Sequence, residues 1–233
     1  MCKICRNENL EGLEILNCND CESLTLIPYI EGLKILYCSG CPLLTTIPYI
    51  KGLIHIYCSN CPLLTIILNI EGLKSLYCQN CSLLNISNIK ELLILDCSNN
   101  PLLSYIPNIK KLRRLDCFNC PSLTNIQNIK QLKILNCYNN PSLTIIPNIE
   151  GLERLSCTDC PSLTRISNIK ELKRLYCFKC PLLMYIPIAK ELNYNMHHGN
   201  MALKLPFEGC KYLTSKKMDK LYNNIYYLYK SYK

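Results

Sequence analysis

Residues 33–52 read LKILYCSGCPLLTTIPYIKG, and the same pattern recurs about every 20 residues from position 13 to 190. Each copy opens on a leucine: Leu13, Leu33, Leu53, Leu73, Leu92, Leu112, Leu132, Leu152 and Leu172. The fourth copy is one residue short, and we place the gap at residues 84–86. Such a period is typical of a solenoid, in which each unit buries its apolar face only against its neighbours. We therefore predict one continuous body of nine repeats over residues 13–190, with residues 1–12 as an N-terminal cap or partial repeat.

Positions within a repeat are numbered here from the opening leucine. Apolar residues at positions 4 and 6 flank an outward residue at position 5, the period-2 pattern of a short strand with one buried face. Isoleucine at position 15 and leucine at position 12 should point inward from the return path. The position-12 residues are Leu24, Leu44, Leu64, Leu84, Leu103, Leu123, Leu143, Leu163 and Leu183. Proline recurs at position 16 and excludes a helix interior there, so we expect a parallel sheet on the concave face and an extended or 3-10 convex side.

The run L-x-x-L-x-C-x-x-C/N resembles the leucine-rich repeat signature, whose ninth position is Asn or Cys. The Cys-Pro-x-Leu-Thr stretch at 160–164 is similar to the cysteine-containing subclass found in many F-box-linked proteins. The 20-residue length with Ile-Pro resembles the short class of bacterial effectors. The bias toward Asn, Ile and Tyr resembles repeat proteins of giant DNA viruses. The chain departs from the family in having Cys rather than Leu at position 6, and no F-box-like segment precedes the repeats.

Sixteen of the 19 cysteines form eight C-x-x-C pairs, and consecutive pairs such as Cys18/Cys21 and Cys38/Cys41 have the spacing of a zinc site. The repeat favours a structural interpretation, because the second cysteine of a pair becomes Asn100 or Asn140 in two copies, and Asn does not replace a zinc thiolate. We interpret position 9 as an inward column that bonds to turn backbone, and position 6 as small core residues. The position-9 column is Cys21, Cys41, Cys61, Cys81, Asn100, Cys120, Asn140, Cys160 and Cys180. Zinc binding and disulfides along the stack remain alternatives.

Ahead of the first repeat, Cys2 and Cys5 form one further pair. They are interpreted either as a shortened capping strand over Cys18 and Cys21 or as the remnant of an upstream repeat.

Outward strand positions are the candidate binding residues, because internal packing does not dictate them. They form a tyrosine column toward one end of the concave face and a basic column with aromatics toward the other. The candidate residues are Tyr37, Tyr57, Tyr77, Arg113, Arg114, Lys133, Arg154, Lys173, Arg174 and Tyr176. Tyr and Arg dominate protein-binding hot spots, so another protein is the favoured partner.

Net charge is +9, and residues 1–89 carry only five basic against seven acidic residues. The basic character therefore belongs to the C-terminal half. Nucleic acid is the less favoured partner, because Asp96, Asp116, Glu153 and Asp159 interrupt the positive stripe.

Residues 191–233 break the repeat and are expected to form a C-terminal cap. Met218, Leu221, Ile225 and Leu228 have helical spacing, which predicts an amphipathic helix over about 215–231 that closes the solenoid or binds a partner or membrane surface. His197, His198 and Cys210 lack metal-site spacing.

Three histidines and no phosphate loop, HExxH or nucleophile-elbow motif argue against an enzyme, and no cofactor is expected. The first residues have no apolar signal segment, and the sequence has no stretch long enough to span a bilayer, so a cytoplasmic protein is expected, in the host cytoplasm if it is viral. The favoured function is a non-enzymatic scaffold or adaptor that binds another protein through its concave face. A self-associating structural protein and a zinc-binding CxxC protein are the alternatives.

Overall fold

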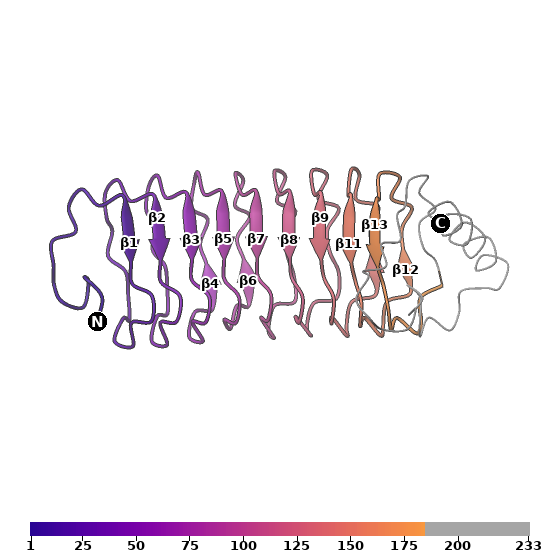
Figure 1. The fold of residues 1–233 in the computed structure, drawn as a ribbon, viewed down its shortest axis with the longest axis horizontal. Coiled ribbons are helices and arrows are strands. Elements are labelled where there is room, and N and C mark those ends of the chain that lie inside the picture. The colour runs from indigo at the N-terminus through magenta and orange to yellow at the C-terminus, as the bar shows by residue number, and fades with distance from the viewer. Residues whose placement is uncertain (185–233) are drawn as a thin grey trace, which may run out of the picture.

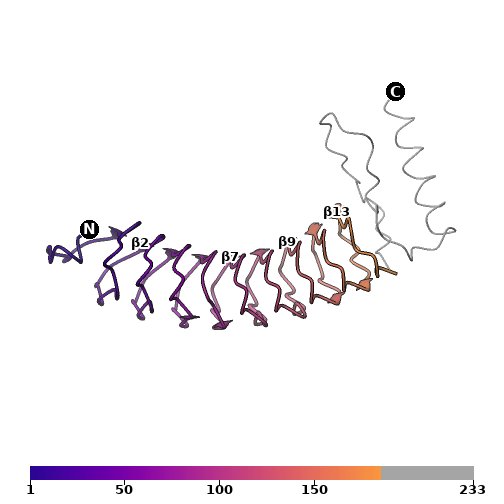
Figure 2. The same ribbon diagram turned by 90° about the horizontal axis from the view of Figure 1, so that it is seen from below.

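The chain winds into a solenoid of parallel strands with one turn per repeat (Figure 1). The structure, a computed structural model, describes residues 1–184. A nine-stranded parallel sheet runs the length of this part in the order β1-β2-β3-β5-β7-β8-β9-β11-β13. Its strands are β1 (Ile15–Asn17), β2 (Ile35–Tyr37), β3 (His55–Tyr57), β5 (Ser75–Tyr77), β7 (Ile94–Asp96), β8 (Arg114–Asp116), β9 (Ile134–Asn136), β11 (Arg154–Ser156) and β13 (Arg174–Tyr176). Figure 2 shows that the body bows and that this sheet lies on its concave side.

Equivalent positions of successive repeats pair in register, so each column of side chains continues through the stack. Leu36 of β2, for example, pairs with Leu16 of β1 and Ile56 of β3. The register holds across the short fourth repeat, where Leu76 of β5 pairs with Leu95 of β7. A one-residue slip would turn every buried side chain outward, which is why the alternating pattern fixes this pairing.

The core consists of columns at positions 1, 4, 6, 9, 12, 15 and 18, nearly all of them fully buried. In the third turn these are Leu53, Ile56, Cys58, Cys61, Leu64, Ile67 and Ile70, each 0% exposed. This turn therefore buries five large aliphatic side chains and two cysteines against its neighbours. Burial of this kind is the main stabilising term, at about 1.5–3 kcal/mol for each aliphatic side chain.

The convex side is extended, and residues 1–184 contain no helix of any kind. Two small parallel sheets lie there, formed by β4 (Ile66–Ile67) with β6 (Asn85–Ile86) and by β10 (Ile145–Ile146) with β12 (Arg165–Ile166). The extended alternative predicted from the position-16 prolines is therefore confirmed, whereas the 3-10 alternative is not seen in these residues.

A left-handed residue at position 8 turns the chain out of the sheet in every repeat. Its φ is 53° at Asp20, 68° at Gly40 and 58° at Asn60, and the same region is used at Asn80, Asn99, Asn119, Asn139, Asp159 and Lys179. Asn and Asp tolerate this conformation better than other side-chain-bearing residues. At Gly40 a Cβ atom would lie 2.1 Å from Oδ1 of Asp20, so a side chain at this position would require the Asp20 carboxylate to move.

The missing residue of the fourth repeat lies earlier than predicted. Leu83 is fully buried whereas Leu84 is 52% exposed, so Leu83, not Leu84, occupies position 12. The gap therefore falls between Cys81 and Leu83, in the exposed turn after position 9. In a full-length repeat the N–H of position 12 donates to the carbonyl of position 9, as from Leu64 to Cys61 at 3.0 Å. In the short turn the Leu83 N–H donates instead to Oδ1 of Asn100, at 3.1 Å.

Residues 3–7 form turns rather than the capping strand considered for the N-terminus. The predicted C-terminal cap, its helix over 215–231 and the histidine pair lie outside the described residues. In the described part of the chain, no helix combines the length and apolar character needed to cross a bilayer.

Candidate functional site

Three tyrosines at position 5 form a stacked ladder on the N-terminal half of the sheet. The ring centroids of Tyr37 and Tyr57 are 4.7 Å apart, and those of Tyr57 and Tyr77 are 4.8 Å apart with planes 3° from parallel. In-register strands impose this spacing, since neighbouring strands lie about 4.8 Å apart. Burial, followed by the neighbouring Tyr77 and Tyr37, raises the pKa of Tyr57. The ladder presents a flat aromatic strip whose side-chain entropy is already reduced before any partner binds.

Two aspartates continue the position-5 column in the middle of the sheet. Asp96 and Asp116 are opposite each other on β7 and β8 and are only 8% and 2% exposed, although the sequence suggested outward acidic residues. Asp116 accepts hydrogen bonds from Nε of Arg114, at 2.6 Å, and from Asn136. Asp96 accepts from Gln79 Nε2 at 2.5 Å and from the Ser98 N–H at 3.2 Å. Arg114 and its neighbours thus cover the carboxylates. Because Arg114 is paired with Asp116, it is not available to bind an external anion.

Burial, opposed by hydrogen bonds from Ser98 and reinforced by the charge of Asp116, raises the pKa of Asp96. The charged form is therefore disfavoured in the folded state, and stability falls as pH rises from the unfolded-state pKa of about 4 through the raised folded-state pKa. We expect Asp96→Asn to increase the free energy of unfolding at pH 7 by about 0.5–1 kcal/mol, the range for relieving like charges opposite each other in a sheet.

Urea unfolding at pH 7 and pH 4 measures this effect, which should shrink at the lower pH because protonation of Asp96 is then further advanced. Asp159→Asn is the matched control, since Asp159 is partly exposed and pairs with Lys179 at 3.3 Å. An Asp96→Asn variant that is less stable than wild type at both pH values would contradict the expectation.

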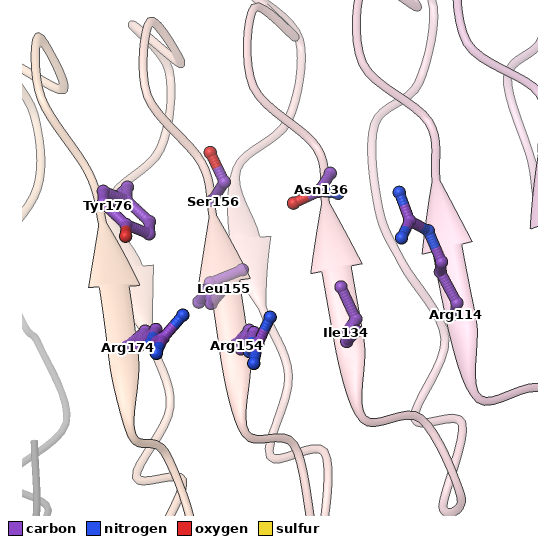
Figure 3. Close-up of a pocket in the computed structure, with 8 residues that line it drawn as sticks. All are labelled: Arg114, Ile134, Asn136, Arg154, Leu155, Ser156, Arg174 and Tyr176. Atoms are coloured by element: carbon purple, nitrogen blue, oxygen red, sulfur yellow. The ribbon is translucent and has the colours of Figure 1, made fainter.

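Arginines at position 3 gather around a shallow hollow on the C-terminal half of the sheet (Figure 3). The hollow has a volume of about 220 Å³ and is lined by Arg114, Ile134, Asn136, Arg154, Leu155, Ser156, Arg174 and Tyr176. Arg154 and Arg174 are register partners on β11 and β13, and Figure 3 shows them side by side. Neither has an ion-pair partner within residues 1–184. Ser156 and Tyr176 lie two residues further along the same two strands. Cationic and hydrogen-bonding side chains therefore line the same hollow.

Lysines at positions 2 and 20 are neutralised by glutamates within the protein, in contrast to these arginines. Glu153 lies between Lys133 and Lys173, at 3.5 and 3.0 Å. Similarly, Glu91 lies between Lys111 and Lys74, at 2.8 and 2.9 Å. Hydrogen bonds from Lys111 and then Lys74 lower the pKa of Glu91 to about 2. Of the predicted basic candidates, the structure therefore groups Arg154 and Arg174 with Tyr176 and separates Lys133 and Lys173 from them.

Arg113, the remaining basic candidate, is exposed at position 2 and does not line the hollow.

Positions 7 and 8 add two further ladders beside the sheet. Phe118 and Tyr138 stack with their centroids 4.5 Å apart. Asn139 donates to Asn119 at 2.5 Å, and Asn119 donates to Asn99 at 2.6 Å. The asparagines thus satisfy one another along the stack, an arrangement that the recurring Asn at position 8 signals in the sequence.

The position-9 column is buried and bonded to backbone across the turns. The Cys61 thiol donates to the Cys38 carbonyl at 3.2 Å, and the same contact recurs at Cys41, Cys81, Cys120, Cys160 and Cys180 at 3.1–3.4 Å. Asn140 makes stronger hydrogen bonds at the same position. Its side chain donates to the carbonyls of Cys117 and Cys137 and accepts from the Cys120 N–H at 2.7 Å.

Burial raises the pKa of the column thiols Cys41, Cys61, Cys81, Cys120 and Cys160 to about 11. The position-6 thiols from Cys38 to Cys157 are more deeply buried, and burial raises their pKa values further. These protonated thiols are poor nucleophiles and poor metal ligands, because both roles require the thiolate.

Comparison with models of known protein families and with curated proteins finds no match for this chain. The functional proposal therefore rests on the geometry of the site.

Proposed function

We propose that the protein is a non-enzymatic, leucine-rich-repeat-like scaffold of the cytoplasm that binds another protein through its concave face. The observation that carries the proposal is the pair Arg154 and Arg174, register partners without an ion-pair partner within residues 1–184. Elsewhere on the sheet side, basic groups such as Lys74 and Lys173 are paired with carboxylates. Two adjacent like charges without counter-ions repel each other, and an acidic ligand removes that repulsion.

The surroundings of the arginine pair favour a protein segment with Asp or Glu side chains. Guanidinium groups bind carboxylates in a bidentate manner, and Tyr176 beside them supplies apolar contact area with a hydroxyl. The tyrosine ladder of Tyr37, Tyr57 and Tyr77 lies further along the same sheet and offers a second, uncharged contact strip. A partner that spans both regions carries acidic groups at one end of its contact surface and apolar groups at the other.

Charge reversal of Arg154 and Arg174 tests the proposal directly. We expect Arg154→Glu with Arg174→Glu to weaken partner binding by about 30-fold or more, the effect of losing about 2 kcal/mol at a hot spot. The measurement is affinity capture from the native cell with the full chain as bait, followed by titration of the captured partner against each variant.

Lys51→Glu with Lys130→Glu is the matched control, because it makes the same change in net charge at exposed residues outside the hollow. Circular dichroism should show the same β-signal for both double variants. A Tyr57→Ala variant reports separately on the tyrosine ladder. Partner sets and affinities that are identical for wild type and the arginine variant would contradict the concave-face proposal.

Self-association is the second candidate, and exposed apolar side chains on the first two turns favour it. Leu26, Tyr29, Leu43 and Tyr49 are 58%, 57%, 44% and 44% exposed on the return path. Exposed large apolar side chains that gather in a patch are typical of interaction sites. Sedimentation or light scattering over a wide concentration range distinguishes the candidates, since a chain that stays monomeric at high concentration excludes self-association.

A further inference from the structure

Three cysteine sulfurs converge where the N-terminal segment meets the first turn of the solenoid. The Sγ atoms of Cys2, Cys5 and Cys21 all lie within 4.8 Å of one another. Cys2 and Cys5 are 3.8 Å apart, and Cys5 and Cys21 are 3.5 Å apart. Within residues 1–184, no other group of three or more Cys, His, Asp or Glu side chains converges in this way.

The spacing of these sulfurs is that of a tetrahedral thiolate site. Zinc–sulfur bonds are about 2.3 Å long, so sulfurs at two corners of a tetrahedron around zinc lie about 3.8 Å apart. Both measured separations are within a few tenths of an ångström of this value. A disulfide, by contrast, requires its two sulfurs to approach to about 2.05 Å.

Cys21 differs chemically from the rest of the position-9 column. In later turns the thiol donates to a carbonyl of the preceding turn, as Cys41 does to Cys18 at 3.1 Å. The sulfur of Cys21 instead accepts the N–H of Cys2 at 3.4 Å and contacts Cys5. The Cys21 side chain is therefore directed toward the N-terminal cysteines instead of bonding to the backbone of a neighbouring turn.

Cys18 precedes Cys21 by the C-x-x-C spacing, so Cys2/Cys5 and Cys18/Cys21 are two C-x-x-C pairs separated by residues 6–17. The sulfur of Cys18 is not part of the converging group, which consists of Cys2, Cys5 and Cys21. Replacement of position 9 by Asn100 and Asn140 argues against zinc in those later turns but does not bear on the first turn.

We propose that Cys2, Cys5 and Cys21 bind one Zn²⁺ ion, with the fourth coordination position open to water. The ion ties residues 2–5 to the turn after β1 and so holds the N-terminal segment against the first turn of the solenoid. Binding displaces the thiol protons, so affinity for the metal rises with pH. The site is independent of the proposed concave-face function, since it lies at the opposite end from Arg154 and Arg174.

Metal analysis of the full chain, purified under reducing conditions, tests this site. We expect about one zinc per wild-type chain and about a tenfold or greater loss in both Cys5→Ser and Cys21→Ser, because each removes one of the three thiolates. Cys61→Ser is the matched control. It alters the same repeat position two turns away, and it should keep the full zinc content.

A second measurement separates zinc binding from misfolding. A zinc chelator should lower the melting temperature of wild type and of Cys61→Ser toward that of Cys5→Ser, and should leave Cys5→Ser unchanged. Zinc-free wild type, equal zinc in wild type and Cys5→Ser, iron in place of zinc, or intact-mass detection of a disulfide among these cysteines in protein kept under reducing conditions would each overturn the proposal.

Discussion

Replacing Asn100 with alanine is expected to lower the free energy of unfolding by about 3 kcal/mol or more, because each buried polar group left without a partner costs about 1–3 kcal/mol. Asn100 is fully buried, and its Nδ2 donates to the carbonyls of Cys78, Cys97 and Ser98 at 2.9, 2.9 and 3.2 Å. Its Oδ1 accepts from the N–H of Leu83 in the shortened turn. One side chain therefore joins two turns and compensates for the residue that the fourth repeat lacks.

The substitution series Asn100→Ala, Asn100→Cys and Cys61→Asn isolates this role. Cysteine fills position 9 in most turns and keeps one contact to a carbonyl, so Asn100→Cys should retain part of the stability. It should still be less stable than wild type, because a thiol is a weak acceptor for the Leu83 N–H. Cys61→Asn should remain within about 1 kcal/mol of wild type, given that Asn140 already fits the same position in a full-length setting.

Urea unfolding followed by circular dichroism measures the series. Equal stability of Asn100→Ala and wild type would show that these hydrogen bonds contribute nothing net to folding.

Leu83→Ala is expected to destabilise the fold by about 3 kcal/mol, whereas Leu84→Ala should change stability by less than about 1 kcal/mol. Leu83 is 0% exposed and Leu84 is 52% exposed. Truncation of a buried leucine removes its transfer free energy and leaves a cavity, and the neighbouring turns are held in register and relax little around it.

Because the two residues are adjacent and chemically identical, the pair controls for composition, expression and denatured-state effects. Equilibrium unfolding of the two variants under one set of conditions gives the comparison. The reverse order of stability would place the gap at residues 84–86 and would show that Leu84 is the core residue.

The strand pattern, the core columns and the extended convex side were predictable because each depends only on the repeat. Leu36 and Cys38 alternate with Tyr37 in one repeat, and nine copies repeat the same signal. Parallel in-register stacking follows, since no other arrangement buries every column at once. The stacking of the tyrosines was predictable from this register alone.

Contacts between particular residues of different turns were less predictable. Leu83 and Leu84 are both leucines, so composition could not place the gap, and the N–H of Leu83 found its partner in Asn100 of the next turn. The aspartates at positions 96 and 116 looked solvent-exposed, because the sequence does not show that Gln79, Arg114 and Asn136 cover them. The convergence of Cys2 and Cys5 on Cys21 depends on a non-repeating turn that no period describes.

The short fourth repeat also indicates how such a chain tolerates a change of length. Loss of one residue is absorbed in the exposed loop after Cys81, where no core column passes, and the strand register of β5 with β7 is unaffected. Gain or loss of a complete repeat also preserves the stacking, because the turns on either side have the same core columns and can pack against each other. The length of the outward face is therefore set by the number of repeats rather than by the sequence of any one of them.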